Sequence, residues 1–122
     1  MTRIVIDTCA GENMRLPVYN EPLAGDWYFD GNGDLQIRVV ATDVVDEDEA
    51  FLIALHELIE AKLCLNAGVT QTAVDVFDSN WTGEGEPGDG VDAPYAKEHR
   101  KAMLIEHTMA MLMGKYDYGR ME

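Results

Sequence analysis

The segment FLIALHELIEAKLC, residues 51–64, places His56, Glu57 and Glu60 in the most apolar stretch of the chain. Leaving such side chains unpaired in a protein core would cost several kcal/mol each, so they must face water, one another or a ligand. His56 and Glu60 are four residues apart, which on a helix puts them on one side, one turn from each other. An imidazole and a carboxylate in this arrangement can bind one metal ion together.

A second pair with the same chemistry follows at His99 and Glu106. On a helix these two residues differ by only about 20° around the axis. We predict a metal site with His56, Glu60 and His99 as ligands, and with Glu106 as a fourth ligand or as a group that orients a ligand histidine. Glu57 is the candidate base for a water that the metal activates. Zinc is the first expectation for the divalent ion, with manganese or iron as alternatives.

The same residues fit a second interpretation that needs no metal. In that case the histidines and glutamates form a hydrogen-bonded polar network, or a stripe that meets water. A helical wheel orders the side chains within one helix but does not show what each face contacts. The sequence therefore leaves open whether the two His–Glu pairs face each other.

The elements that must position these residues follow from turn and capping signals. WYFDGNGDLQIRVVAT, residues 27–42, predicts a β-hairpin, Asp46 and Thr70 can cap helices, and the glycine of Asn66-Ala-Gly68 ends the first one. The expected order is a strand at 3–7, a loop at 8–25, the hairpin, and helices at about 46–65, 70–79 and 94–114. Strands followed by helices predict an α+β fold, with a small antiparallel sheet packed against three helices.

The third predicted helix has two distinguishable faces. Its expected wet side carries Lys97, Lys101 and Thr108, and His99 and Glu106 lie at the edge of the opposite, apolar side. That apolar side holds Tyr95, Ala102, Ile105, Met109 and Met113.

The length of 122 residues predicts a single domain, with the sheet at about 1–42, helices at about 46–114 and a flexible tail at 115–122. A formal charge of −14 disfavours direct binding to nucleic acid, whose phosphates would repel it. It fits an acidic enzyme, a cation binder or a protein that presents acids to a basic partner. The acid-rich run 43–49 is most simply a charged helix start.

Membrane and secretory signals are missing from the sequence pattern. No apolar run has the length of a membrane span, and MTRIVIDTCAGEN lacks the pattern of a signal peptide. Cys9 and Cys64 stand in no CxxC or paired-ligand spacing. We expect a cytoplasmic protein with free thiols, without a membrane partner.

The HELIE segment resembles the HExxH motif of the zincin metallopeptidases. His56 matches the first metal ligand and Glu57 matches the general base, whereas Glu60 stands where the second histidine belongs. The resemblance implies a metal-dependent hydrolase. A carboxylate is a harder ligand than an imidazole, so this departure leaves the metal less tied to zinc.

A longer resemblance runs from Gly25 to about His99. The series GDWYFDGNGDLQIRV, ALHELIEAKLC, VDVFD and EPGDGVDAPYAKEH is similar to a family of small, uncharacterised proteins of tailed bacteriophages and prophages. The resemblance implies a phage protein in the cytoplasm of a bacterial host, and it implies no activity.

The segment DSNWTGEGEPGD, residues 78–89, has oxygen-bearing side chains at the spacing of an EF-hand calcium loop. Gly85 stands where an apolar residue is usual, and the last position is Asp89 rather than a glutamate. An ordinary acidic loop is the interpretation we favour, with calcium binding as the alternative.

These observations support two functions of different classes. The first is a small phage-encoded metal-binding protein that acts as a metal-dependent hydrolase, whose substrate is a peptide, an amide or a phosphoester. The second is a non-enzymatic acidic protein that binds and inhibits a host factor, with the His/Glu cluster in a structural role. A host protein or peptide is the expected partner in either case.

Overall fold

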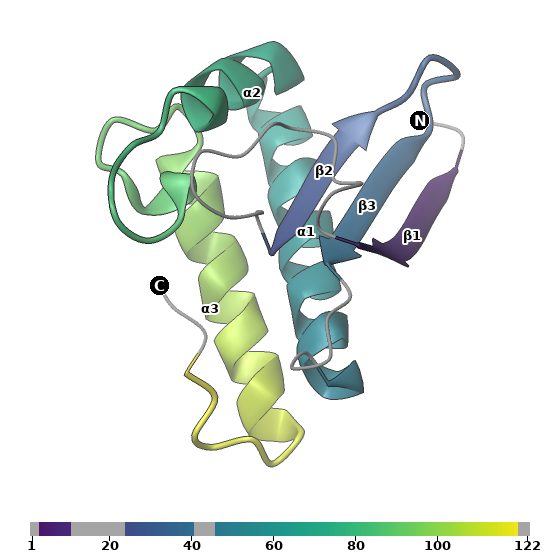
Figure 1. Ribbon diagram of the computed structural model, residues 1–122, viewed down its shortest axis with the longest axis vertical. Coiled ribbons are helices and arrows are strands. Elements are labelled where there is room, and N and C mark those ends of the chain that lie inside the picture. Colours follow the sequence, from purple (N-terminus) through teal and green to yellow (C-terminus); the bar gives the residue numbers. More distant parts are fainter. Residues whose placement is uncertain (1–2, 11–23, 41–45, 120–122) are drawn as a thin grey trace.

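The computed structural model describes residues 3–10, 24–40 and 46–119. Their order of strands followed by helices confirms the predicted α+β fold. The elements are β1 (Ile4–Cys9), β2 (Gly25–Phe29), β3 (Leu35–Val40), α1 (Glu47–Ala67), α2 (Gln71–Ser79), the short 3₁₀ helix η2 (Pro87–Asp89) and α3 (Ala96–Leu112) (Figure 1).

The three strands form one sheet in the order β1-β3-β2. β2 and β3 are the predicted hairpin, and the side chain of Asp30 closes its turn by accepting hydrogen bonds from the backbone N–H groups of Asn32 and Asp34. β1 pairs with β3 in parallel, so the sheet is mixed, and the expectation of a wholly antiparallel sheet was wrong. The long connection from β1 to β2 lets β1 reach the far edge of β3, which a tight hairpin could not do.

The helices begin and end where the capping signals predicted. Asp46 accepts a hydrogen bond from the backbone N–H of Glu49 at 2.7 Å, and Thr70 accepts one from that of Ala73 at 3.1 Å. Gly68 ends α1 in the left-handed conformation, with φ of 76°, which a glycine adopts at little cost. These local signals fix the length of α1 and therefore where its three ionisable residues lie.

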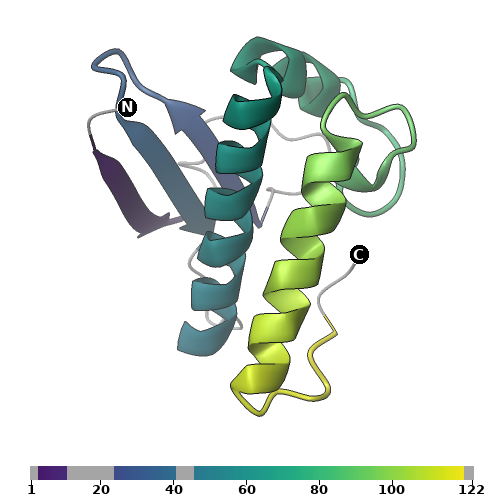
Figure 2. The same ribbon diagram turned by 180° about the vertical axis from the view of Figure 1, so that it is seen from behind.

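α1 is the central element of the described structure. One side of it packs on β2 and β3, and another side packs along α3, which runs in the opposite direction (Figures 1 and 2). Contacts on both sides explain why α1 is apolar around most of its circumference. They also place its His–Glu stripe against α3, away from water.

The face of α3 that meets α1 is only in part the one predicted: Tyr95 and Ala102 are buried as expected, and the expected wet side is exposed. Ile105, expected on the apolar side, is 43% exposed, and the neighbouring Leu104 is more exposed still. The buried positions are His99, Ala102, Met103, Glu106 and Ala110. Small alanines let the helices approach closely, so the polar pair lies at the centre of the interface rather than at its edge.

The segment after α3 folds back onto the helices. The hydroxyl of Tyr118 donates a hydrogen bond to Glu106 at 2.5 Å, and Lys115 lies 3.6 Å from a carboxylate oxygen of Asp46. Most of the loop expected at 8–25, and the start of the acidic run at 43–45, lie outside the described residues. Among the helices that the structure describes, none is both long enough and apolar enough to cross a membrane.

Candidate metal centre

The packing of α1 on α3 brings the two His–Glu pairs together. His56 and Glu60 project from successive turns of α1, and His99 projects toward them from the first turn of α3. The rings of the two histidines lie 4.8 Å apart in an edge-to-face arrangement. The question that the helical wheel left open is therefore answered: this stripe lines a shared internal site.

One carboxylate oxygen is the meeting point. Oε2 of Glu60 lies 3.2 Å from Nε2 of His56 and 2.9 Å from Nδ1 of His99. Metal–ligand bonds of 2.0–2.2 Å in a tetrahedral arrangement put neighbouring ligand atoms roughly 3.3–3.6 Å apart, so only a small expansion separates these contacts from a metal shell. His56, Glu60 and His99 are buried and close enough to hold a metal ion.

Each of these three residues also has a partner on its outer side. Oε1 of Glu106 lies 2.8 Å from Nδ1 of His56, and Oδ1 of Asp89 lies 3.0 Å from Nε2 of His99. The indole N–H of Trp27 donates a hydrogen bond to the other oxygen of Glu60, at 3.1 Å. Metal-binding histidines usually donate the far N–H to a carboxylate, a backbone carbonyl or a water, which fixes the ring and its tautomer.

The contact of His56 with Glu106 is short but lies off the direction of the ring N–H, so Nδ1 has no well-aligned hydrogen bond. The distance and the complete burial of Glu106 make it a strong charge interaction all the same. It favours a proton on Nδ1, which leaves the lone pair of Nε2 directed at Glu60.

The donor set fits a cation. With protons on the two outer ring nitrogens, three electron-pair donors converge: Nε2 of His56, Nδ1 of His99 and Oε2 of Glu60. Three lone pairs at this separation repel one another unless a proton or a metal ion lies among them. Two imidazoles and one carboxylate are the ligand set that zinc, manganese and iron accept.

The pKa shifts of the cluster also favour positive charge among these donors. Burial alone would lower the pKa of His56, but its contacts with Glu106 and Glu60 outweigh burial and raise that pKa to about 10. Burial likewise opposes a raised pKa of His99, and the contact with Glu60 overcomes it. Burial would raise the pKa of Glu60, yet its hydrogen bonds with both histidines lower it.

Glu57 lies beside the three donors. Its Oε2 is 4.0 Å from Nε2 of His56, and burial together with the charge of Glu60 raises its pKa well above the usual range. Glu57 and the donors line one polar cavity of about 20 Å³, enough for one water molecule or ion. The cavity is lined by Gly25, His56, Glu57, Glu60, Asp78, Glu86, Pro87, Gly88, Tyr95 and His99.

Two glycines close the cavity. A Cβ atom at Gly88 would lie 2.5 Å from Cγ and Nδ1 of His99, and a Cβ at Gly25 would lie 2.8 Å from Cγ of Glu57. Real Cβ atoms do not approach other atoms so closely, so η2 and the start of β2 can seal the site only because these residues are glycines.

The predicted site residues therefore separate into three positions. His56, Glu60 and His99 converge, Glu57 lines the same cavity, and Glu106 contacts the opposite side of the His56 ring. From there Glu106 can orient the histidine but cannot share an ion bound at Nε2.

Sequence reasoning did not find Trp27, Gly88 or Tyr118, and it considered Asp89 only as a calcium ligand. Each of the four is distant in sequence from the residue it contacts, and no spacing rule relates the two.

Two other groups of side chains have the composition of an ion site. Asp78 accepts a hydrogen bond from Tyr95 and Asp89 pairs with His99, so the first and last positions of the predicted calcium loop are engaged elsewhere. Glu86, Asp89 and His99 also lie within metal-holding distance of one another. That group uses the outer nitrogen of His99 and is more exposed, so the buried group is the stronger candidate.

Comparison of the chain with protein-family models, with curated proteins and with solved structures gave no match.

Proposed function

We propose that this chain is a metal-binding protein that holds one divalent transition-metal ion, zinc in the first instance, at His56, Glu60 and His99. The observation that supports the proposal is the completeness of the arrangement. Three buried donors converge, and each has its own outer partner: Glu106, Asp89 and Trp27. The same contacts would also satisfy two protonated imidazole rings without a metal, so the elemental analysis below decides between the two.

We further propose that the ion supports hydrolysis. A metal ion in such a site supplies Lewis-acid activation of water. Glu57 is the residue placed to accept the proton, because it lines the cavity beside the donors. Glu60 stays ionised as a ligand, so the two glutamates of HELIE have different tasks.

Substrate access requires movement of η2. The cavity holds about 20 Å³, and Gly88 lies against the ring of His99. A space of about 20 Å³ holds one water molecule but not a peptide, amide or phosphoester group, so we propose that η2 moves to admit the substrate. We expect hydrolysis to depend on opening of this segment.

The small size of the cavity also fits a second function, that of a non-enzymatic protein that inhibits a host factor. An acidic protein that inhibits a host factor would use the same ion only to hold α1 and α3 together, and a closed site suits that role. The resemblance to phage proteins is compatible with both functions, and we propose on that ground that the protein acts in the cytoplasm of a bacterial host.

Elemental analysis of protein purified without chelator or tag metal tests the first proposal. We expect near-stoichiometric metal in the wild type and its loss in His56→Ala and His99→Ala. His107→Ala is the matched control, since it removes the third histidine of the chain from the same helix as His99. No metal in the wild type, and no thermal shift on adding zinc, manganese or ferrous iron, would refute it.

Glu57→Gln separates the two functions. If the protein is a hydrolase, this variant keeps its metal and its fold but loses turnover in a panel of peptide, amide and phosphoester substrates. If the wild-type protein is fully loaded with metal and inactive on the whole panel, the hydrolase proposal is refuted. The metal then has a structural role.

A further inference from the structure

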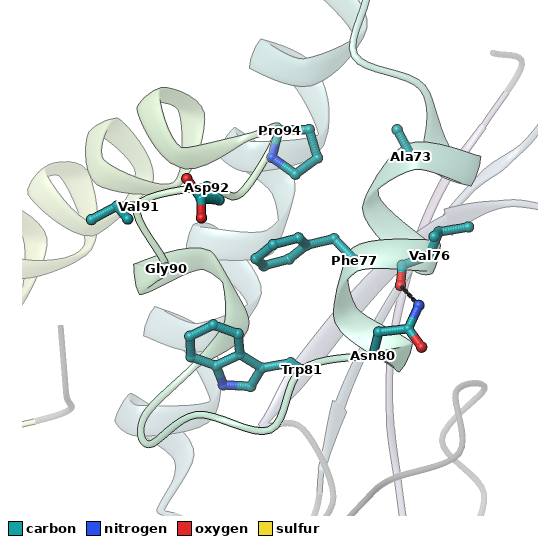
Figure 3. Close-up of a pocket in the computed structure, with 9 residues that line it drawn as sticks. All are labelled: Ala73, Val76, Phe77, Asn80, Trp81, Gly90, Val91, Asp92 and Pro94. Carbon is teal, nitrogen blue, oxygen red and sulfur yellow. Dashed lines mark hydrogen bonds between the residues drawn. The ribbon is translucent and has the colours of Figure 1, made fainter.

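A second feature lies on the other side of α2, away from the metal donors. An open groove of about 520 Å³ runs between α2 and the segment 90–94. Phe77 and Trp81 extend into the space between the two walls, with Val91, Asp92 and Pro94 across from them (Figure 3). It is lined by Ala73, Val76, Phe77, Asn80, Trp81, Gly90, Val91, Asp92 and Pro94.

The groove presents apolar surface to solvent. Val76 is 57% exposed and Val91 is 92% exposed. The rings of Phe77 and Trp81 lie 5.8 Å apart, tilted by 32°, and form an aromatic floor. Exposed aliphatic groups around aromatic rings, in a concave site of this volume, are typical of a binding pocket.

The floor is held in place by the backbone around it. The indole N–H of Trp81 donates a hydrogen bond to the carbonyl of Gly85 at 3.3 Å. A Cβ at Gly83 would lie 2.5 Å from the Trp81 ring, and one at Gly90 would lie 2.9 Å from it. The ring is thus seated on glycine backbone, so a ligand would meet a formed site rather than order one.

The acidic residues in this part of the chain favour a ligand with positive charge. Residues 63–96 contain six acidic residues and no lysine, arginine or histidine: Asp75, Asp78, Glu84, Glu86, Asp89 and Asp92. Asp92 lines the groove itself. Acidic surroundings attract cations, and aromatic faces add cation–π attraction, whereas an acidic ligand would be repelled.

We propose that this groove docks a short segment of a partner protein in which an apolar side chain is flanked by lysine or arginine. The apolar side chain lies over Phe77 and Trp81, and the flanking cation meets Asp92 and the aromatic faces. The inference uses none of the metal donors, so it stands or falls separately from the proposed metal site. It also differs from docking at the acidic start of α1, about 30 Å along the helix from the end that leads into α2.

The two tryptophans of the chain make the test internally controlled. In a ¹⁵N–¹H spectrum of the intact protein each gives one indole resonance: Trp81 reports on the groove and Trp27 on the metal site. The probe is the acetylated peptide Lys-Leu-Lys-Leu-Lys. We expect it to shift the Trp81 indole resonance saturably and to leave that of Trp27 in place.

Three comparison peptides separate the contribution of the positive charges from that of the apolar side chains. Lys-Ser-Lys-Ser-Lys keeps the charge, Gln-Leu-Gln-Leu-Gln keeps the apolar groups, and Glu-Leu-Glu-Leu-Glu reverses the charge. We expect each to bind at least about tenfold more weakly than the probe. Equal binding of the serine peptide would show simple attraction to an acidic protein, and equal binding of either other leucine peptide would remove the charge requirement. Either result would overturn the proposal.

Val91→Lys tests the location, because this side chain is almost fully exposed and its replacement leaves the core intact. We expect it to weaken the probe by about tenfold through like-charge repulsion. Asp48→Asn at the far end of α1 makes the same change in net charge and should leave affinity almost unchanged. Equal losses in both variants, or peptide-induced shifts centred on residues 46–49, would place binding elsewhere.

Discussion

Glu106 gives the sharpest test of how the metal site is built. The Glu106→Gln substitution keeps the volume and shape of a side chain that is 0% exposed. It removes the charge that lies 2.8 Å from Nδ1 of His56. The amide can still meet the hydroxyl of Tyr118, so we expect the helices to stay packed and the protein to stay folded.

The size of the effect follows from the position of Glu106. As a residue that orients a ligand and strengthens its basicity, it should contribute roughly 10–100-fold to metal affinity, or about 1.4–2.7 kcal/mol. Removing a ligand itself, as in Glu60→Gln or His56→Ala, should abolish binding. Glu98→Gln, on the same helix but outside the site, is the matched control.

The loss should also depend on pH. Glu106 strengthens proton binding as well as metal binding, since it helps to raise the pKa of His56 to about 10. Below that pH, a metal ion must displace a proton from His56. The Glu106→Gln variant holds this proton more weakly than the wild type, and this offsets part of its loss of metal affinity. The difference between wild type and variant should therefore widen from about pH 7 to about pH 9.

The assay is competition for zinc against a chromophoric chelator at several pH values, with circular dichroism as a check of the fold. Unchanged affinity at every pH would refute the orienting role. A loss as complete as that of His56→Ala would mean that Glu106 is itself a ligand, and the assignment of its position would then be wrong.

Further measurements test the site and its supports. Gly88→Ala should lower stability in urea by roughly 1–3 kcal/mol, because its Cβ would overlap a ligand histidine; Gly31→Ala, in open space, should not. Thr70→Ala should cost about 1 kcal/mol through loss of the α2 cap, whereas Thr72→Ala should cost much less. Chelation should lower the melting temperature, since free metal at about 100 times its Kd stabilises by about 2.7 kcal/mol. In chelated protein the raised pKa of His56 stabilises the fold below its unfolded value of about 6.5. That stability should fall as pH rises toward about 10, and a flat urea midpoint over this range would contradict it.

Local signals predicted the helices well because they act within a few residues. Asp46, Thr70 and Gly68 cap their helices by contacts that the sequence spacing already contains. The pairing of His56 with Glu60 is local in the same sense, since one helical turn relates them.

The rest of the site could not be predicted because its contacts join distant parts of the chain. Trp27 meets Glu60 across 33 positions, and His99 meets it across 39. The buried face of α3 was misjudged in part for a related reason. Hydrophobicity correctly favoured Ala102 but also favoured Ile105, which is exposed, and it did not favour Ala110, which is buried. The parallel pairing of β1 likewise depends on a connection whose path no turn signal specifies.

The distance along the chain between Glu60 and His99 has a consequence for folding. An ion held by both residues would act as a reversible cross-link, closing a loop that contains α2, η2 and the aromatic floor of the groove. Such a closure removes conformational entropy from the unfolded chain much as a disulfide does. The supply of metal would then set how much of the protein is folded, and with it the shape of a surface that the ion never touches.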